Sequence, residues 1–241
     1  IYLSIGKDEV DLADFYDGLI AKLFNRNAIN VHKDTELTRR FTHKELALFL
    51  KDNFGTNAYN KRVPEFIKKS KEDCRRCFVQ GYLDSDGSVF YDRGNVRANF
   101  TSVNLELLED IQDILYSLKI RCSIVLHQNE TKNKLFINKD GSNSISLKSY
   151  RINVARSDVR KLSEDRIFCS RKQILIDNAS SSGKSKMNIS FSNDGTKVYI
   201  GIDDIICDTY SGVVYNFECE THTFMTRNIL THNCDPLSLA G

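Results

Sequence analysis

Apolar residues recur along much of the chain with a period close to 3.6 residues, which places them on one face of an α-helix. The clearest stripe runs from Leu105 to Leu118. Two other stretches follow Thr42 and Ser70, residue types that cap the first turn of a helix. The pattern predicts helices over residues 13–25, 42–50, 70–84 and 105–118, and from residue 157.

Alternating apolar and polar residues predict strands between and after these helices. Residues 88–103 alternate around Asp92-Arg93-Gly94-Asn95, which is typical of a hairpin turn. A serine-rich break at 179–183 separates a mixed helical and strand part from a strand-rich part. Further strands are expected at 2–5, 9–12, 121–126, 133–137, 149–155, 188–191, 197–202, 213–219 and 223–225. The fold class predicted is therefore mixed α/β.

The composition limits the class of protein and the cellular compartment that we expect for this chain. Of its 241 residues, 41% are apolar, which excludes wholesale disorder. Seven scattered cysteines favour free thiols and hence a reducing, cytoplasmic compartment. No apolar run is long enough to span a bilayer, and the first residues lack the pattern of a secretory signal, so no membrane partner is expected.

The formal charge of +2 hides an uneven distribution. Basic residues outnumber acidic ones in 34–76 and 115–175, whereas acidic residues dominate 1–25 and 197–241. The basic stretches either contact phosphates of a nucleic acid or form a solvated lysine-rich surface.

Three consecutive residues near the end of the chain, His232, Asn233 and Cys234, form a set with a defined chemistry. An asparagine amide can attack its own main-chain carbonyl, forming a succinimide and breaking the next peptide bond. A preceding histidine can stabilise the charge on that carbonyl, and a following cysteine thiolate can accept an acyl group. A hairpin would bring His222 beside the same bond to assist proton transfer. Taken singly, His222 is better explained as a buried structural histidine on a strand, and Cys234 as a plain tail cysteine.

Residues 214–224 and 229–234 resemble, with the spacing kept, the two C-terminal splicing blocks of inteins. The resemblance implies an all-β HINT splicing fold that needs no cofactor. It makes Asn233 the last intein residue, Cys234 the first residue of the downstream host protein (the extein), and His232 and His222 the assisting histidines. The family often has Asp where this chain has Asn216, and an amide cannot transfer a proton.

The first residues lack the other part of that chemistry. Inteins begin with a nucleophilic Cys or Ser and carry a Thr-x-x-His block, whereas residue 1 is Ile and no histidine has Thr three positions before it. We therefore expect the HINT domain to be incomplete at its N-terminus. Its expected partner is an N-terminal intein fragment, either a separate chain or a missing segment.

A second candidate site lies where the helix expected at 70–84 ends. Asp84 and Asp86 are unfavourable against the helix dipole there unless a cation neutralises them. Carboxylate oxygens suit Mg²⁺, which stabilises displacement at a phosphodiester. Gly81 would let two such helices approach closely. The alternative is an Asp-Ser-Asp-Gly turn that merely ends a helix.

Residues 77–88 resemble the LAGLIDADG dodecapeptide of homing endonucleases, and residues 60–67 resemble the Lys-x-x-Pro block before its second copy. The resemblance implies an α+β half of order αββαββα that binds double-stranded DNA. It makes Asp86 the catalytic acid and Mg²⁺ ligand, Gly81 a helix-interface residue, and Lys61 and Arg62 DNA-binding residues. Such enzymes use two dodecapeptides; residues 12–18 are at best a degenerate echo.

These observations predict four segments: 1–30 and 179–233 as parts of the HINT domain, 31–178 as the endonuclease-like insertion, and 234–241 as an extein stub. The function expected is autocatalytic protein splicing, with Asn cyclisation and acyl transfer to Cys234, in trans with an N-terminal fragment. The alternatives are a site-specific homing endonuclease module, and an inactive DNA-binding insertion that helps two intein pieces associate.

Overall fold

The computed structural model describes residues 1–32, 36–128, 135–137, 143–145, 148–163, 170–179, 187–202, 204–213, 215, 219–226 and 229–232. They belong to two compact units, residues 1–201 and 202–241, which are treated separately below. The predicted mixed α/β class is confirmed. None of the helices within the described residues is long and apolar enough to cross a bilayer.

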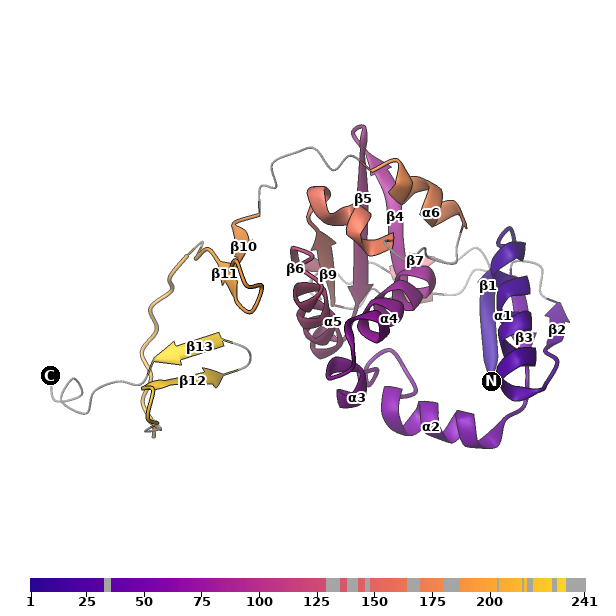
Figure 1. The fold of residues 1–241 in the computed structure, drawn as a ribbon, viewed down its shortest axis with the longest axis horizontal. Helices are drawn as coiled ribbons and strands as arrows, with labels where there is room; N and C mark the ends of the chain where they lie inside the picture. Colours follow the sequence, from indigo (N-terminus) through magenta and orange to yellow (C-terminus); the bar gives the residue numbers. More distant parts are fainter. Residues whose placement is uncertain are drawn as a thin grey trace, which may run out of the picture. The chain divides into compact units, whose positions relative to one another are not determined.

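The larger part of the first unit is a four-stranded antiparallel sheet of order β4-β5-β9-β6. Its elements are α4 (Glu72–Ser85), β4 (Gly87–Asp92), β5 (Asn95–Ser102), α5 (Leu105–Ser117), β6 (Cys122–Gln128), β9 (Ser149–Val154), η1 (Arg156–Ser163) and α6 (Ser170–Asp177). A short hairpin, β7 (Leu135–Ile137) and β8 (Asn143–Ile145), is inserted between β6 and β9. Apart from that hairpin, the predicted order αββαββα is confirmed, with the 3₁₀ helix η1 added before α6 (Figure 1).

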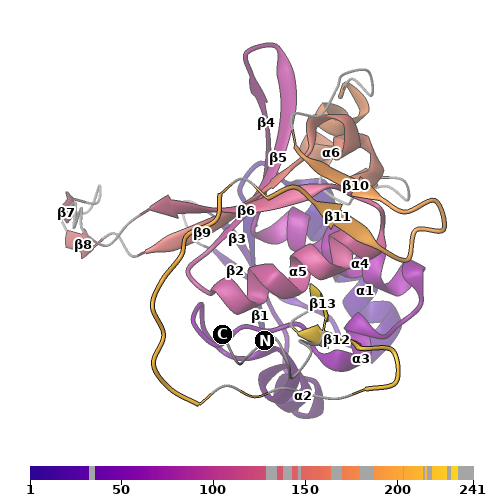
Figure 2. The ribbon, with the colours of Figure 1, turned by 90° about the vertical axis from the view of Figure 1, so that its left-hand side faces the viewer.

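The main core lies between this sheet and the helices packed on it. Figure 2 shows α5 running under β6 and β9. The apolar stripe predicted from periodicity is buried along α5, where Leu108, Ile111 and Leu115 are fully enclosed. Phe100 of β5 and Ile152 of β9 meet the stripe from the sheet, and both are fully buried. Burial of this apolar area is the main force that holds α5 on the sheet.

The N-terminal part of the first unit has a smaller sheet and its own core. Its elements are β1 (Tyr2–Gly6), α1 (Val10–Phe24), β2 (Ile29–His32) and β3 (Glu36–Arg40), with strand order β1-β3-β2. The strand predicted at 9–12 is wrong, because α1 begins at Val10. Four alternating residues do not distinguish a strand from the start of a helix, and here Leu12, Ala13 and Tyr16 lie on the face of α1 that packs against Ile5.

The smaller sheet shares its topology with three strands of the larger sheet, β5, β6 and β9. In each set, a strand, a helix and two further strands of the same sheet follow along the chain, and the last strand lies in the middle: β1-β3-β2 in one and β5-β9-β6 in the other. In each, a four-residue connection follows the helix and contains one residue with positive φ, Asn25 (49°) or Lys119 (58°). Residues 1–40 therefore repeat the topology of 95–154. The predicted boundary after residue 30 falls inside β2, so the smaller sheet continues across it.

Two short helices join these parts, α2 (Lys44–Phe54) and α3 (Glu65–Lys68). The two predicted N-caps, Thr42 for α2 and Ser70 for α4, are both wrong. His43, not Thr42, caps α2, with Nδ1 accepting a hydrogen bond from the Leu46 N–H at 3.1 Å. Ser70 instead donates to the Ile67 carbonyl of α3 at 2.7 Å, and the N-cap residue of α4 is Lys71.

The strand-rich C-terminal part is only partly as predicted. β10 (Ile189–Phe191) and β11 (Val198–Ile200) form a hairpin of the first unit, where Phe191 meets the Tyr116 ring of α5 edge to face. In the second unit, β12 (Thr223–Thr226) and β13 (Ile229–His232) form another. The described residues within 213–219 lie outside any strand, contrary to the prediction. The break at 179–183 lies almost wholly outside the described residues.

Candidate active site

Asp86 stands at the junction of the dodecapeptide helix and the first strand of the larger sheet. It is the C-terminal cap of α4, and its N–H donates to the Tyr82 carbonyl at 3.0 Å. Gly87 then turns the chain into β4. A Cβ atom at Gly87 would lie 2.7 Å from the Leu83 Cα, so only glycine fits this close approach. The Asp-Gly pair thus places the Asp86 carboxylate at the rim of the sheet.

Lys61 meets Asp86 there, although 25 positions separate them in the sequence. The Lys61 Nζ lies 2.8 Å from the Asp86 Oδ2, and each side chain is a little under half exposed, 45% and 44%. The cation offsets the unfavourable interaction of this carboxylate with the negative end of the helix dipole. Both residues line an open pocket of about 340 Å³, together with Ala58, Tyr82, Thr101, Ser102, Val103 and Ser149.

The side chain of Arg62 makes its hydrogen bonds outside that pocket. Its guanidinium donates to the carbonyls of Asp52 and Asn53, in the last turn of α2. Carbonyls at a helix end have no partner within the helix, so Arg62 stabilises α2 by satisfying them. This structural role was not foreseen from the sequence, and of the two predicted DNA-binding residues it is Lys61 that reaches the pocket.

The two acids of the dodecapeptide have different surroundings. Asp84 is buried at 5% exposure, whereas Asp86 faces the pocket. Beside Asp84, the buried Lys172 of α6 donates to the carbonyls of Leu83 and Asp84 in the last turn of α4. Lys172 therefore holds the end of the helix that carries Asp86. No sequence signal singled it out, since it is one of many lysines in a basic stretch.

Tyr82 forms one wall of the pocket. Its ring stacks on Phe100, with centroids 5.7 Å apart. Burial, helped by the negative charge of Asp86, raises the pKa of the Tyr82 phenol above its ordinary value of 10.0. The hydroxyl therefore stays protonated at neutral pH and can donate a hydrogen bond to a ligand in the pocket.

The predicted helix-interface glycine lies on an open face of α4. A Cβ atom built at Gly81 has nothing within 4 Å. Cys74, Cys77 and Ser85 are exposed on the same helix. Small side chains at this spacing permit the close approach of another helix, but none within the described residues covers Gly81. The interface role of Gly81 stays a prediction.

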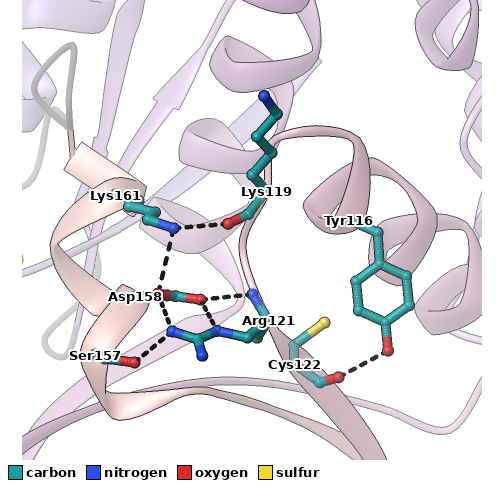
Figure 3. A network of polar contacts seen from close by, with 7 residues as sticks. All are labelled: Tyr116, Lys119, Arg121, Cys122, Ser157, Asp158 and Lys161. Carbon is teal, nitrogen blue, oxygen red and sulfur yellow. Dashed lines mark hydrogen bonds and ion pairs between the residues drawn. The ribbon is translucent and has the colours of Figure 1, made fainter. Parts of the chain in front are cut away.

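Part of the basic stretch 115–175 has internal partners, which the sequence did not indicate. Asp158 of η1 is almost fully buried and accepts hydrogen bonds from the N–H and the Nε of Arg121, at 2.9 and 2.8 Å (Figure 3). Lys161 pairs with Asp158 at 3.3 Å and donates to the Lys119 carbonyl at 2.8 Å. The sequence suggested either phosphate contacts or a solvated surface for these charges. Neither interpretation includes the ion pairs within the protein that some of them form.

Another cation of the stretch, Arg151, lies on the sheet next to the pocket. Arg151 of β9 donates through Nε to the Thr101 Oγ1 at 3.2 Å, and its terminal nitrogen lies 2.7 Å from the His127 Nε2. Partial burial and the charge of Arg151 lower the pKa of His127. His127 is therefore neutral at pH 7 and accepts from Arg151, so the guanidinium is held in one orientation beside Thr101.

Of the predicted splicing residues, the described part of the second unit contains His222 and the backbone of His232. Thr223 pairs with His232 across the β12–β13 hairpin. His222 precedes β12, has a φ of 54°, and its N–H donates to the Cys219 carbonyl at 2.9 Å. Asn216, Asn233, Cys234 and the side chain of His232 lie outside the described residues.

The same unit exposes large apolar side chains. Ile206 is 86% and Tyr215 82% exposed, and Ile202, Ile205, Tyr210, Val213, Ile229 and Leu230 are also exposed.

Comparison with known proteins finds one family that part of the chain resembles. Residues 73–164 match the model of the LAGLIDADG-like domain. The DNA polymerase of Thermococcus hydrothermalis is 24% identical over 97% of this chain and 13% of its own length. The ATP-dependent DNA helicase Hel308 of Thermococcus kodakarensis is 27% identical over 99% of this chain and 20% of its own. The chain thus spans a fifth or less of these relatives.

Among solved structures, I-DmoI in complex with DNA and Ca is similar, with 17% identity, a TM-score of 0.48, and coverage of 68% of this chain and 75% of that one. The matched residues run from α4 to η1, and α6, the last helix of the αββαββα order, follows them. Residues 73–164 thus resemble a LAGLIDADG-like domain, and Lys61, which precedes the matched part, meets its Asp86 at the end of the dodecapeptide helix.

Proposed function

We propose that this chain is the C-terminal portion of an intein that carries an endonuclease-like domain, and that it severs its own backbone after Asn233. The observation that supports this most directly is the pairing of Thr223 with His232. Because Thr223 follows His222 and His232 precedes Asn233 in the sequence, this pair adjoins both residues along the chain. It supports the proposal that His222 acts at the bond after Asn233.

The proposed reaction uses four side chains. The Cys234 thiolate first attacks the ester or thioester that joins the upstream host protein to the nucleophile of the N-terminal segment; that bond breaks, the acyl group passes to the Cys234 sulfur, and the N-terminal nucleophile leaves and takes up a proton. The Asn233 amide nitrogen then attacks its own carbonyl carbon, and the bond from that carbon to the Cys234 nitrogen breaks. His232 stabilises the oxyanion, and His222 supplies the proton that the leaving nitrogen takes up. The Cys234 thiol must remain reduced, which agrees with a reducing compartment.

The relatives support an inserted element. Nearly the whole chain aligns with a small part of a DNA polymerase and with a small part of a DNA helicase, two enzymes of different activity. A segment shared by otherwise different host proteins is expected of an element that excises itself, because its removal restores the host.

The exposed apolar side chains of the second unit support a partner segment. A two-stranded hairpin cannot form a stable core by itself. We propose that an N-terminal splicing segment, carrying the first nucleophile and the Thr-x-x-His block, packs on Ile206, Tyr215 and their neighbours. This segment belongs either to a longer form of the same polypeptide or to a separate chain.

Mass spectrometry of the purified chain tests the proposal. Incubation with dithiothreitol at neutral pH, with and without a synthetic N-terminal intein segment, should release the peptide 234–241 and leave a succinimide at residue 233. Asn233→Ala should abolish release, and His222→Ala should slow it by about 10²-fold or more. His127→Ala is the matched control and should have no effect. Equal release from the Asn233→Ala variant, or none from the unaltered chain under any condition, would exclude the proposal.

A second candidate function is site-specific cleavage of double-stranded DNA, which the contact between Lys61 and Asp86 favours. A single carboxylate with an open pocket beside it fits Mg²⁺, which is usually held by one or two carboxylates together with phosphate and water. Asp86 would hold the ion, which when bound supplies charge stabilisation at the scissile phosphate. Lys61 would neutralise the phosphate, and Tyr82 would donate a hydrogen bond to it.

Cleavage of a randomised plasmid library in the presence of Mg²⁺ tests this function. Asp86→Asn should abolish cleavage and leave salt-dependent DNA binding intact. Asp92→Asn, an exposed acid on the neighbouring strand, is the matched control and should cleave normally. Binding without cleavage by the unaltered chain would instead favour an inactive DNA-binding insertion, and cleavage by the Asp86→Asn variant would exclude the role of this carboxylate.

A further inference from the structure

The loop that carries Lys61 is stiffened by amide side chains. Asn60 Oδ1 accepts from the N–H groups of Thr56 and Asn57, both at 2.9 Å. Asn57 Oδ1 in turn accepts from the Tyr59 N–H at 2.9 Å. These bonds give residues 56–60 a defined shape, but they all lie within the loop. They do not determine where the loop stands relative to Asp86.

Asn104 connects this loop to the pocket wall. It is the N-cap of α5, and its Oδ1 accepts from the Leu107 N–H at 3.2 Å. Its Nδ2 donates to the Tyr59 carbonyl at 2.9 Å and to the Lys61 carbonyl at 2.8 Å. One amide therefore uses its acceptor for the helix and both of its donor hydrogens for the loop.

We propose that Asn104 is a positioning residue, which holds the Lys61 backbone so that the Lys61 ammonium stays in the pocket beside Asp86. This inference rests on the proposed endonuclease function, to which it adds a residue that positions Lys61. The Lys61–Asp86 pair is nearly half exposed, and an ion pair of that exposure contributes little energy while it restricts a long, flexible side chain. The contact therefore depends on a backbone anchor close to the lysine, which Asn104 supplies.

The cap and the anchor are separable by mutation. Asn104→Ser keeps a good N-cap residue on α5 but removes the two hydrogen bonds to the loop, because serine has no second donor and a shorter reach. Asn104→Ala removes both functions. The matched control is Asp110→Asn on the same helix, because Asp110 contacts Lys68 at 2.9 Å and the Val63 N–H at 3.4 Å but not Lys61.

Amine labelling of the full chain, followed by mass spectrometry, tests the anchor without DNA. Lys69, with 80% of its side chain exposed, is the internal standard. Asp86→Asn releases Lys61 and should raise its labelling rate severalfold, and Asn104→Ser should reach the same rate with an unchanged unfolding midpoint. Asp110→Asn should leave the rate unchanged. The proposal is overturned if Asn104→Ser labels like the unaltered chain, or if Asp86→Asn does not raise the rate.

Cleavage then tests whether Asn104 acts through Lys61. Asn104→Ser should lower the rate of DNA cleavage by the same factor as Lys61→Ala, and should lower it no further in a chain that already carries Lys61→Ala. A purely structural residue would instead reduce the rate equally in both backgrounds, which would overturn the inference. If the unaltered chain cuts no DNA, the endonuclease function fails, and the labelling experiment still decides the positioning role.

Discussion

The buried carboxylate of Asp158 allows the sharpest test of how the domain is held together. Its side chain is 2% exposed and that of Arg121 is 27% exposed, so the acid depends on Arg121 while the cation can still reach water. Asp158→Asn keeps one acceptor oxygen but turns an amide toward the guanidinium. About two charge-assisted hydrogen bonds are lost, each worth about 1.5 kcal/mol at the low end of the range. We expect a loss of about 3 kcal/mol.

Urea unfolding followed by circular dichroism measures this loss. With a slope of about 2 kcal/mol per molar urea, the midpoint should fall by about 1.5 M. Asp92→Asn is the control, because Asp92 and Arg97 are 3.5 Å apart and both nearly half exposed. It should cost less than about 1 kcal/mol. Equal shifts in the two variants, or an undiminished effect of Asp158→Asn in an Arg121→Met background, would refute the reasoning.

The stability difference between the unaltered chain and Asp158→Asn should also depend on pH, in a direction that the pKa of Asp158 determines. Burial raises the pKa of Asp158, but the hydrogen bonds from Arg121 and the charges of Lys161 and Arg121 outweigh it, so the folded-state pKa lies below the ordinary value of 3.8. A lowered pKa contributes stability that is fully present above the unfolded-state pKa and is lost as the pH falls through the folded-state pKa. The difference between the unaltered chain and Asp158→Asn should therefore be constant near pH 7 and shrink below pH 3.8. A difference that grows on acidification would contradict this.

Three further outcomes are expected. Phe100→Ala, at a fully buried core position, should lower the free energy of unfolding by about 3–5 kcal/mol in urea, and a loss under about 1 kcal/mol would show that the core is not packed as described. Lys172→Met should cost about 3 kcal/mol in the same assay, because the carbonyls of Leu83 and Asp84 lose a charged donor, whereas an unchanged midpoint would contradict that role. Asn216→Asp should accelerate release of the peptide 234–241 by about tenfold or more in the mass-spectrometric assay, since a carboxylate can transfer a proton and an amide cannot; an unchanged rate would mean that this position takes no part.

Elements specified by neighbouring residues were predictable. The stripe of α5 and the hairpin around Arg93-Gly94 depend on a local period and a local turn, and both stand where the pattern put them. The caps were not predictable, because Ser70 has two competing uses and the packing of α3 selects one. The short strand expected at 9–12 failed because its alternation is also the start of a helical face.

The repeat of the β1-α1-β2-β3 topology by β5-α5-β6-β9 left no trace that sequence reasoning detected. Topology depends on which strands pair, and many different side chains satisfy the same pairing. The connection between β6 and β9 also contains an inserted hairpin, which hides the correspondence along the chain.

The candidate chemistry of the chain was available from its residues alone. Amide, imidazole and thiol groups near the end, and an acid at the close of a glycine-containing helix, point to candidate reactions because functional groups and short spacings are properties of the sequence. The meeting of Lys61 with Asp86, the burial of Asp84 beside Lys172, and the capture of Arg121 by Asp158 were not, because each joins residues far apart in the chain. Such contacts arise when packing of the core brings distant backbone segments together, and no local pattern records that distance.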